Sequence, residues 1–396
     1  MQNDNVDTSA SSPRCRRATQ SPGYVMMPAA AGVVAAETIG VLVCDDSVVV
    51  RSVIERLLRT VPSIRVVAKA VNGVEAIEAV RAGGIDVVVL DIEMPVMDGL
   101  VALPRLLAAD RAVKVLMSST TTTSGGANAL ESLRLGASDF IPKPTALAEV
   151  ATSDGFRAEL IAKVLGLGKQ SHAYRARHAV GPRAPMPHSP AAAALQLRPA
   201  PQRRPSVLGI GSSTGGPAAL LSLFKELGGR VAVPIVLTQH MPPTFTQQFA
   251  EHIHRLGGAT CGEAVHGEPL RPGHVHLAPG NRHLTVVARE GGVSIALTDD
   301  PPENFCRPAV DPMLRSLSAA YPGRVMVLML TGMGQDGLLG AKQVVADGGS
   351  VIAQDEASSI VWGMPGAVAR AGLCHAVLPL NELAPKLLQF VGRTGA

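Results

Sequence analysis

The sequence predicts an α/β protein made of two doubly wound parallel-sheet domains joined by a flexible linker. Its 396 residues suit two or three domains. Short apolar strands alternate with helical patterns over residues 37–165 and again over residues 206–396. Residues 166–205 are rich in proline, arginine and alanine, and this composition buries too little apolar surface to form a core. Residues 1–36 are expected to form a flexible extension.

Composition excludes several classes of protein. The net charge of +4 comes from residues 166–205, which carry seven basic and no acidic side chains, whereas a DNA-binding fold carries its basic face on a folded domain. No uninterrupted apolar run approaches the roughly 20 residues that a membrane helix needs. The five cysteines have no C-x-x-C spacing, which is typical of a reducing compartment. We expect a cytoplasmic monomer that binds no nucleic acid and does not insert into a membrane.

The first domain alternates strands with helices. Within the expected strand at 86–90, the four residues after Asp86 are continuously apolar, which is typical of a parallel strand buried on both faces. The expected strands are 41–44, 65–70, 86–90, 114–117 and one at about 139–142, and the expected helices are 49–59, 73–82 and 127–135.

Polar residues close these strands. Asp45 and Asp46 follow the first, Asp91 the third, Ser118 the fourth and Lys143 the fifth. Ligands of doubly wound sheets bind at the carboxyl ends of the strands, so these side chains are expected to share one site. Three converging carboxylates repel one another unless a cation neutralises them, and Mg²⁺ suits such oxygen ligands. A carboxylate beside Mg²⁺, an ammonium and a hydroxyl can accept a phosphoryl group.

These motifs resemble those of a response-regulator receiver domain, which has a flavodoxin-like fold. The resemblance covers residues 39–145 and rests on Asp45-Asp46-Ser47, Asp91-Ile-Glu-Met-Pro95, Met97-Asp98-Gly99, Ser118 and Lys143-Pro144.

The resemblance implies a role for each residue of this site. Asp91 would be phosphorylated by a histidine kinase. Asp45, Asp46 and Asp91 would bind Mg²⁺, assisted by the main-chain carbonyl of Glu93. The phosphoryl group would be contacted by Lys143 and coupled to the output surface by Ser118 and Phe140.

The second domain opens with a strand, a glycine-rich loop and a helix. The loop at 211–216 lacks the Lys-Ser/Thr of a P-loop and the third glycine of a dinucleotide-binding fingerprint. It matches G-x-S-x-G centred on Ser213, between a strand at 206–210 and a helix at 217–227. This is the context of a nucleophile elbow.

Two further strands supply partners for that serine. The strand at 234–238 ends just before His240, and the strand at 324–330 leads into a glycine-rich turn that carries Asp336. Serine, histidine and aspartate at three strand ends suit acyl transfer. His274 and His276 are interpreted as structural, because no carboxylate is expected near them.

The second domain resembles the catalytic domain of chemotaxis protein-glutamate methylesterases, a Rossmann-like α/β fold. The matching motifs are Gly211-Ser-Ser213-Thr-Gly-Gly216, Thr238-Gln-His240-Met-Pro-Pro243, Leu277-Ala-Pro-Gly280, Thr331-Gly-Met-Gly-Gln-Asp336-Gly, Ala353-Gln-Asp-Glu-Ala357 and Gly363-Met-Pro365. The resemblance implies that Ser213 is the nucleophile, His240 the general base and Asp336 the residue that orients His240. Main-chain N–H groups near Thr214 and Met333 would stabilise the oxyanion.

The resemblance also implies a function and partners. The protein would hydrolyse glutamate γ-methyl esters on methyl-accepting chemoreceptors, releasing methanol, and would deamidate receptor glutamines, with no cofactor for either reaction. The unphosphorylated receiver domain would cover the esterase cleft, and phosphorylation by the chemotaxis histidine kinase would uncover it. The alternative is a catalytically silent, phosphate-gated adaptor of a two-component system.

Overall fold

The computed structural model describes residues 38–119, 123–143, 154–178, 195–257 and 259–392. The expected extension at 1–36 lies outside these ranges, as do residues 179–194 of the expected linker.

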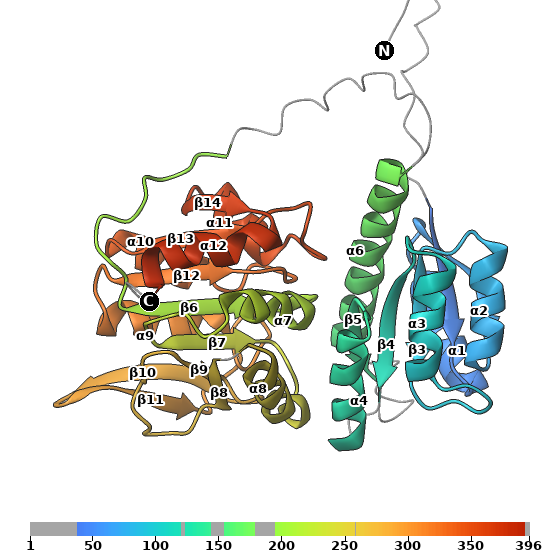
Figure 1. Cartoon of the computed structure of the whole chain (residues 1–396), viewed down its shortest axis with the longest axis horizontal. Coiled ribbons are helices and arrows are strands. Elements are labelled where there is room, and N and C mark those ends of the chain that lie inside the picture. Colours follow the sequence, from blue (N-terminus) through green and yellow to red (C-terminus); the bar gives the residue numbers. More distant parts are fainter. Residues whose placement is uncertain (1–37, 120–122, 144–153, 179–194, 258, 393–396) are drawn as a thin grey trace, which may run out of the picture. The chain divides into compact units, whose positions relative to one another are not determined.

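The first domain contains a five-stranded parallel sheet in the order β2-β1-β3-β4-β5 (Figure 1). The strands are β1 (Ile39–Cys44), β2 (Ile64–Ala70), β3 (Val87–Asp91), β4 (Lys114–Ser119) and β5 (Asp139–Pro142). The chain runs from β1 outward to β2 and then crosses back to β3 on the other side of β1. This reversal makes the carboxyl ends of β1 and β3 the switch point of the sheet, where doubly wound folds bind ligands.

Local sequence signals fix where the helices of this domain begin. The side chains of Ser47, Asn72 and Asp98 each accept a hydrogen bond from a main-chain N–H of the first helical turn, as N-cap residues do. The helices are α1 (Val48–Leu58), α2 (Gly73–Ala82), α3 (Gly99–Ala109), α4 (Thr123–Arg134) and α6 (Asp154–His178).

Helix α6 continues beyond the point where we expected the linker to begin. It is helical through His178, and both Leu167 and Ser171 are buried. The Ser171 hydroxyl donates to the Asp86 carboxylate at 3.1 Å, and Arg175 donates to the Ile85 carbonyl at 2.9 Å. Arg175, which belongs to the expected linker charge, therefore anchors the helix to the first domain.

The second domain contains a seven-stranded parallel sheet in the order β14-β13-β12-β6-β7-β9-β8 (Figure 1). Its strands are β6 (Val207–Ser212), β7 (Ile235–Gln239), β8 (Thr260–Glu263), β9 (His274–Leu277), β12 (Val325–Met329), β13 (Ser350–Gln354) and β14 (Cys374–Leu378). β10 (His283–Arg289) and β11 (Gly292–Thr298) form a separate antiparallel hairpin. The switch point lies between β6 and β12. The expected fold class, two doubly wound parallel sheets, is confirmed.

Apolar helices pack on this sheet. Every residue of β6, β7, β12 and β13 is buried, as expected for parallel strands covered on both faces. The helices are α7 (Gly216–Leu227), α8 (Pro243–Gly257), α9 (Val310–Ala320), α10 (Leu338–Ala346), α11 (Met364–Arg370) and α12 (Leu380–Val391). Among the helices of the described ranges, none is long and apolar enough to cross a bilayer.

Candidate active site and phosphorylation site

The first sheet brings together the acidic residues expected at its switch point. Oxygen atoms of Asp45, Asp46 and Asp91 all lie within 4.8 Å of one another. The Lys143 ammonium lies 2.9 Å from an Asp45 oxygen and 2.7 Å from an Asp91 oxygen. Ser118 is buried and pairs with Asp91 in the β3–β4 register. The grouping expected from the strand ends is therefore present.

Burial controls the electrostatics of this cluster. Burial raises the pKa of Asp91 to about 6, and the Asp45 charge also raises this pKa. The hydrogen bond and the charge of Lys143 lower it. The main-chain N–H of Glu93 also lowers this pKa. Three carboxylates converging from two loops are the donor set that Mg²⁺ prefers, so the residues fit the ion. That they bind it in the protein stays a prediction.

In the second sheet, Ser213, His240 and Asp336 follow three adjacent strands. β6 pairs with β7 on one side and with β12 on the other, so their carboxyl ends are neighbours. The His240 Nε2 lies 2.8 Å from a carboxylate oxygen of Asp336. The structure thus places the three residues at one sheet edge and forms the histidine–aspartate half of a triad.

Asp336 is held by a set of donors at the start of α9 and in the preceding loop. Its carboxylate accepts hydrogen bonds from the main-chain N–H groups of Val310 (2.6 Å), Asp311 (3.1 Å) and Gly337 (2.9 Å) and from the Asn304 amide (2.9 Å). Burial would raise the pKa of Asp336, but its bond to His240 and these donors hold the pKa below its ordinary value. The carboxylate therefore stays ionised while buried.

The second nitrogen of His240 faces a cysteine. Its Nδ1 lies 3.4 Å from the Cys306 thiol, and within the described residues the Ser213 hydroxyl makes no hydrogen bond to the ring. Burial would lower the pKa of His240, but the bonds to Asp336 and Cys306 raise it to about 10. Both the contact of Nδ1 with Cys306 and this raised pKa oppose the transfer of a proton from Ser213 to His240. No motif in the sequence indicated Cys306, which lies in a loop distant from His240 in the chain.

Gln239 connects the serine loop to the histidine. It accepts a hydrogen bond from the Ser212 hydroxyl at 2.7 Å and donates to the main-chain carbonyls of Ser213 at 2.9 Å and His240 at 3.0 Å. Both Ser212 and Gln239 are fully enclosed. We had not assigned Gln239 a role, although it directly precedes His240. Its contacts link the loop that carries Ser213 to His240.

The expected oxyanion donors lie on the two loops that flank the serine. Among the described residues, neither the Thr214 nor the Met333 main-chain N–H donates a hydrogen bond. A side chain at Gly332 would place its Cβ 2.9 Å from the Ser213 Cβ, so glycine lets the two loops approach. The main-chain N–H groups of Thr214 and Met333 suit the stabilisation of an oxyanion formed at Ser213. That they stabilise it stays a prediction.

Ser213, Thr214, His240 and Met333 line one cavity of about 930 Å³. The second domain contributes Ser213 and His240 to its lining, together with apolar side chains and the loop at 304–308. Residues of β5 and α6 close another part of it: Asp139, Phe140, Ala158, Glu159 and Lys163.

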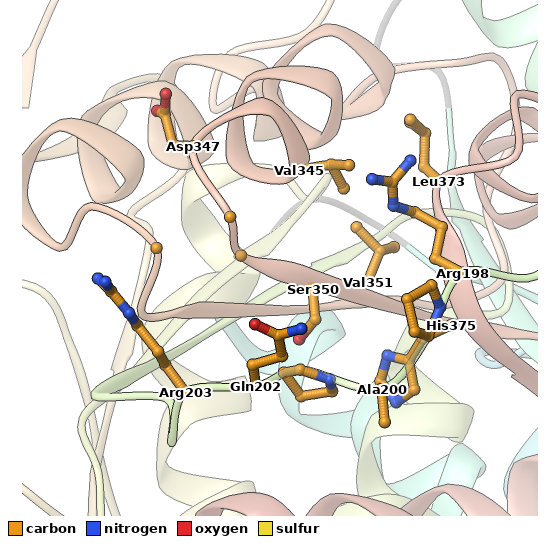
Figure 2. Close-up of a pocket in the computed structure, with 15 residues that line it drawn as sticks. Arg198, Ala200, Gln202, Arg203, Val345, Asp347, Ser350, Val351, Leu373 and His375 are labelled. Carbon is orange, nitrogen blue, oxygen red and sulfur yellow. The ribbon is translucent and has the colours of Figure 1, made fainter.

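A smaller cavity, of about 410 Å³, lies at the opposite edge of the second sheet. Figure 2 shows its lining, which includes Arg198, Gln202, Ser350 and His375. Ser350 begins β13, so this cavity is at the amino-terminal ends of the strands. It takes no part in the arrangement around Ser213.

The two sheets belong to one compact unit, Thr38–Ala396, and contact each other beside the serine loop. The Asp139 carboxylate accepts a hydrogen bond from the Gly215 N–H at 2.8 Å and pairs with Lys163 at 3.0 Å. Phe140, the expected coupling residue, is buried and stacks on Phe245 of α8 with ring centroids 5.1 Å apart. The strand end that carries Phe140 therefore touches the catalytic domain directly.

The histidine pair of β9 departs from expectation in one respect. His276 is fully buried, and its Nδ1 lies 3.0 Å from the Glu268 carboxylate. Our expectation that no carboxylate would be near was wrong, because the turn before β9 folds Glu268 back onto the strand. The interpretation of the pair as structural is unaffected.

Comparison with known families matches both halves of the chain. A family model described as a response regulator receiver domain matches residues 41–153, and one described as CheB methylesterase matches residues 208–387.

Relatives of full length are also similar. A protein-glutamate methylesterase/protein-glutamine glutaminase of Azospirillum brasilense is 49% identical over 378 residues, covering 91% of this chain and 95% of its own. One of Paramagnetospirillum magneticum is 48% identical over 374 residues, covering 91% and 98%. Among solved structures, the Thermotoga maritima CheB methylesterase catalytic domain is 40% identical, with a TM-score of 0.46, covering 47% of this chain and 99% of its own.

The raised pKa of Asp91 predicts a pH-dependent stabilisation by Asp91→Asn. Above pH 6 the folded protein carries a buried charge that the unfolded chain carries in water. The neutral amide should therefore raise the free energy of unfolding at pH 7.5 by up to about 3 kcal/mol, and the gain should shrink as the pH falls through 6 towards 4. Urea unfolding in EDTA measures this, with the exposed Glu78→Gln as control. A gain independent of pH would contradict it.

The contacts of His240 predict that Cys306→Ala lowers the pKa of His240 from about 10, and that Asp336→Asn lowers it too, since hydrogen bonds and charge at both residues raise it. An NMR titration of the imidazole nitrogens measures both shifts. Cys261→Ala, at a cysteine of β8, is the matched control. An unchanged pKa in Cys306→Ala would show that the thiol does not interact with the ring.

Proposed function

Since this chain belongs to the family of protein-glutamate methylesterases/protein-glutamine glutaminases, we propose that it hydrolyses glutamate γ-methyl esters on chemoreceptors, releasing methanol, and deamidates receptor glutamines. The observation that carries the proposal is the placement of Ser213, His240 and Asp336 at three adjacent strand ends, with His240 bonded to Asp336.

The reaction begins with transfer of the Ser213 hydroxyl proton to His240. Nδ1 is the nitrogen that receives it, because Nε2 is bonded to Asp336. The serine oxygen attacks the ester carbonyl carbon, and the resulting oxyanion is stabilised by the N–H groups of Thr214 and Met333. His240 then protonates the departing methoxide, and methanol leaves an acyl-enzyme.

Water completes the cycle. His240 removes a proton from a water molecule, the hydroxide attacks the acyl carbon, and Ser213 leaves with that proton. A glutamine side chain follows the same steps with ammonia as the leaving group. To accept a proton, His240 must be neutral and its Nδ1 must face Ser213. The Cys306 thiol therefore has to move away from Nδ1.

Phosphorylation of Asp91 is proposed to control access to this site. Asp45, Asp46 and Asp91 would hold Mg²⁺, which neutralises the charge gathered there, with the Glu93 carbonyl as a further ligand. Lys143 would contact the phosphoryl group donated by a histidine kinase. The Ser118 side chain would move in response to this phosphoryl group. Ser118 and Phe140 lie on neighbouring strands, so a shift at Ser118 reaches Phe140 and its stacking partner Phe245.

The contact beside the serine loop supports inhibition by occupation of the cleft. Asp139 accepts a hydrogen bond from the Gly215 N–H at the amino end of α7, a helix end that favours developing negative charge. Because Lys163 neutralises the Asp139 carboxylate, the contact acts by taking up this N–H group and by narrowing the cavity. Withdrawing β5 would free the N–H group and widen the cavity together. The four cysteines of the described ranges are unpaired, which supports a cytoplasmic location.

We expect Ser213→Ala to abolish methanol release from methylated receptors, because no other hydroxyl occupies the elbow position. Ser212→Ala should keep most of kcat and lose about 1 to 3 kcal/mol of stability, since it leaves the buried Gln239 oxygen without a donor. Methanol release and urea unfolding measure the two effects. The reverse result would transfer the nucleophile to Ser212, and an inactive wild type would favour the silent adaptor.

The gating proposal predicts that a small phosphodonor with Mg²⁺ raises the activity of the full-length protein but not that of Asp91→Asn. Gly166→Ala should raise activity without a phosphodonor, because its Cβ would lie 2.2 Å from the Ile360 carbonyl and push the two domains apart. Lys169→Ala, on an exposed position of the same helix, is the control. Equal methanol release by all four proteins, with or without phosphodonor, would refute gating.

A further inference from the structure

A fully exposed phenylalanine stands beside the catalytic residues. Phe305 has 103% of its reference surface exposed, whereas Phe140, Phe224, Phe245 and Phe249 are buried. Burying a phenylalanine side chain stabilises a fold by about 1.5 to 3 kcal/mol, and Phe305 contributes none of this.

The backbone at Phe305 adds a second cost. Asn304 and Phe305 have φ values of 52° and 63°, and they are the central residues of a turn closed by two hydrogen bonds between Glu303 and Cys306 (3.1 and 2.9 Å). Positive φ at both central residues defines a type I′ turn, which favours asparagine first and glycine second. A bulky side chain at the second position is strained by about 1 to 2 kcal/mol.

Neighbouring contacts hold the turn in this conformation. The Asn304 amide donates to Asp311 at 3.0 Å and to Asp336 at 2.9 Å. Arg315 pairs with the Glu303 carboxylate through two bonds, of 2.9 and 2.6 Å. The turn is thus fixed to the triad aspartate on one side and presents its aromatic ring to solvent on the other.

The position of the ring indicates what it contacts. Phe305 lines the same cavity as Ser213 and His240, as does the half-exposed Met333. The resemblance to chemotaxis methylesterases implies that the substrate glutamates lie on signalling helices of the receptor. An ester that enters this cavity would bring with it the side chains three and four residues away on the same helical face. On an amphipathic helix some of these are apolar.

We propose that Phe305 is a specificity-determining anchor, which packs against an apolar side chain one helical turn from the glutamate being demethylated. The inference rests on the proposed function and adds to it the residue by which the enzyme recognises a helical protein substrate rather than a free ester. The continuity of the ring with the catalytic cavity assigns it to the substrate.

The test compares two substrates in the full-length protein with phosphodonor and Mg²⁺: methylated receptor in membranes, and the γ-methyl ester of N-acetylglutamate amide. Phe305→Ala should lower kcat/KM for the receptor at least tenfold more than for the small ester, chiefly through KM. Phe305→Tyr, which keeps the ring, should restore the receptor activity. Val287→Ala, an exposed apolar truncation on the β10–β11 hairpin, should change both substrates equally.

Phe305→Gly separates recognition from folding. Glycine relieves the positive φ, so this variant should have a higher Tm than the wild type and still lose receptor activity. Equal losses on both substrates, or full receptor activity in Phe305→Gly, would overturn the anchor. If the wild type hydrolyses neither substrate, the proposed function fails, and the anchor fails with it.

Discussion

Parallel pairing of the strands is the constraint on which both sites depend. In each sheet the carboxyl ends of all strands share one edge, and the chain reverses its direction of winding at one point of that edge. In the first sheet this point gathers the residues around Asp91, and in the second it gathers Ser213, His240 and Asp336. His240 and Asp336, which are 96 positions apart, become neighbours because backbone pairing brings their strands together. The loops after these strands have to span only a short distance to place the side chains.

The second site also depends on a buried charge that is fully paired. Asp336 has donors from three main-chain N–H groups and one amide besides its histidine, so its desolvation is offset and its orientation is fixed. The same turn that supplies Asn304 places Cys306 on the other side of His240. The protonation of His240 therefore depends on Cys306 as well as on Asp336.

The sequence allowed the strands of the first sheet and the three strands that carry Ser213, His240 and Asp336 to be predicted, because buried parallel strands are short apolar runs with abrupt polar ends. It did not allow the contacts of Asn304, Cys306 and Asp139 to be predicted. Each of these contacts joins segments distant in sequence, and none of the three residues belongs to a periodic pattern or motif assigned to the triad. The extent of α6 was missed for a related reason, since its last turns are polar and are held by pairs such as Arg175 with Asp110.

Placing the receiver sheet and the esterase sheet on one chain has a consequence for the cell. The contact between Asp139 and Gly215 is intramolecular, so the fraction of molecules in which it is formed does not depend on protein concentration. A separate inhibitor would release its enzyme whenever the two were made in unequal amounts or diluted at division. Here each copy of the enzyme carries its own inhibitory contact, so at a given degree of phosphorylation of Asp91 the fraction of molecules with the contact open stays the same when the total amount of protein varies.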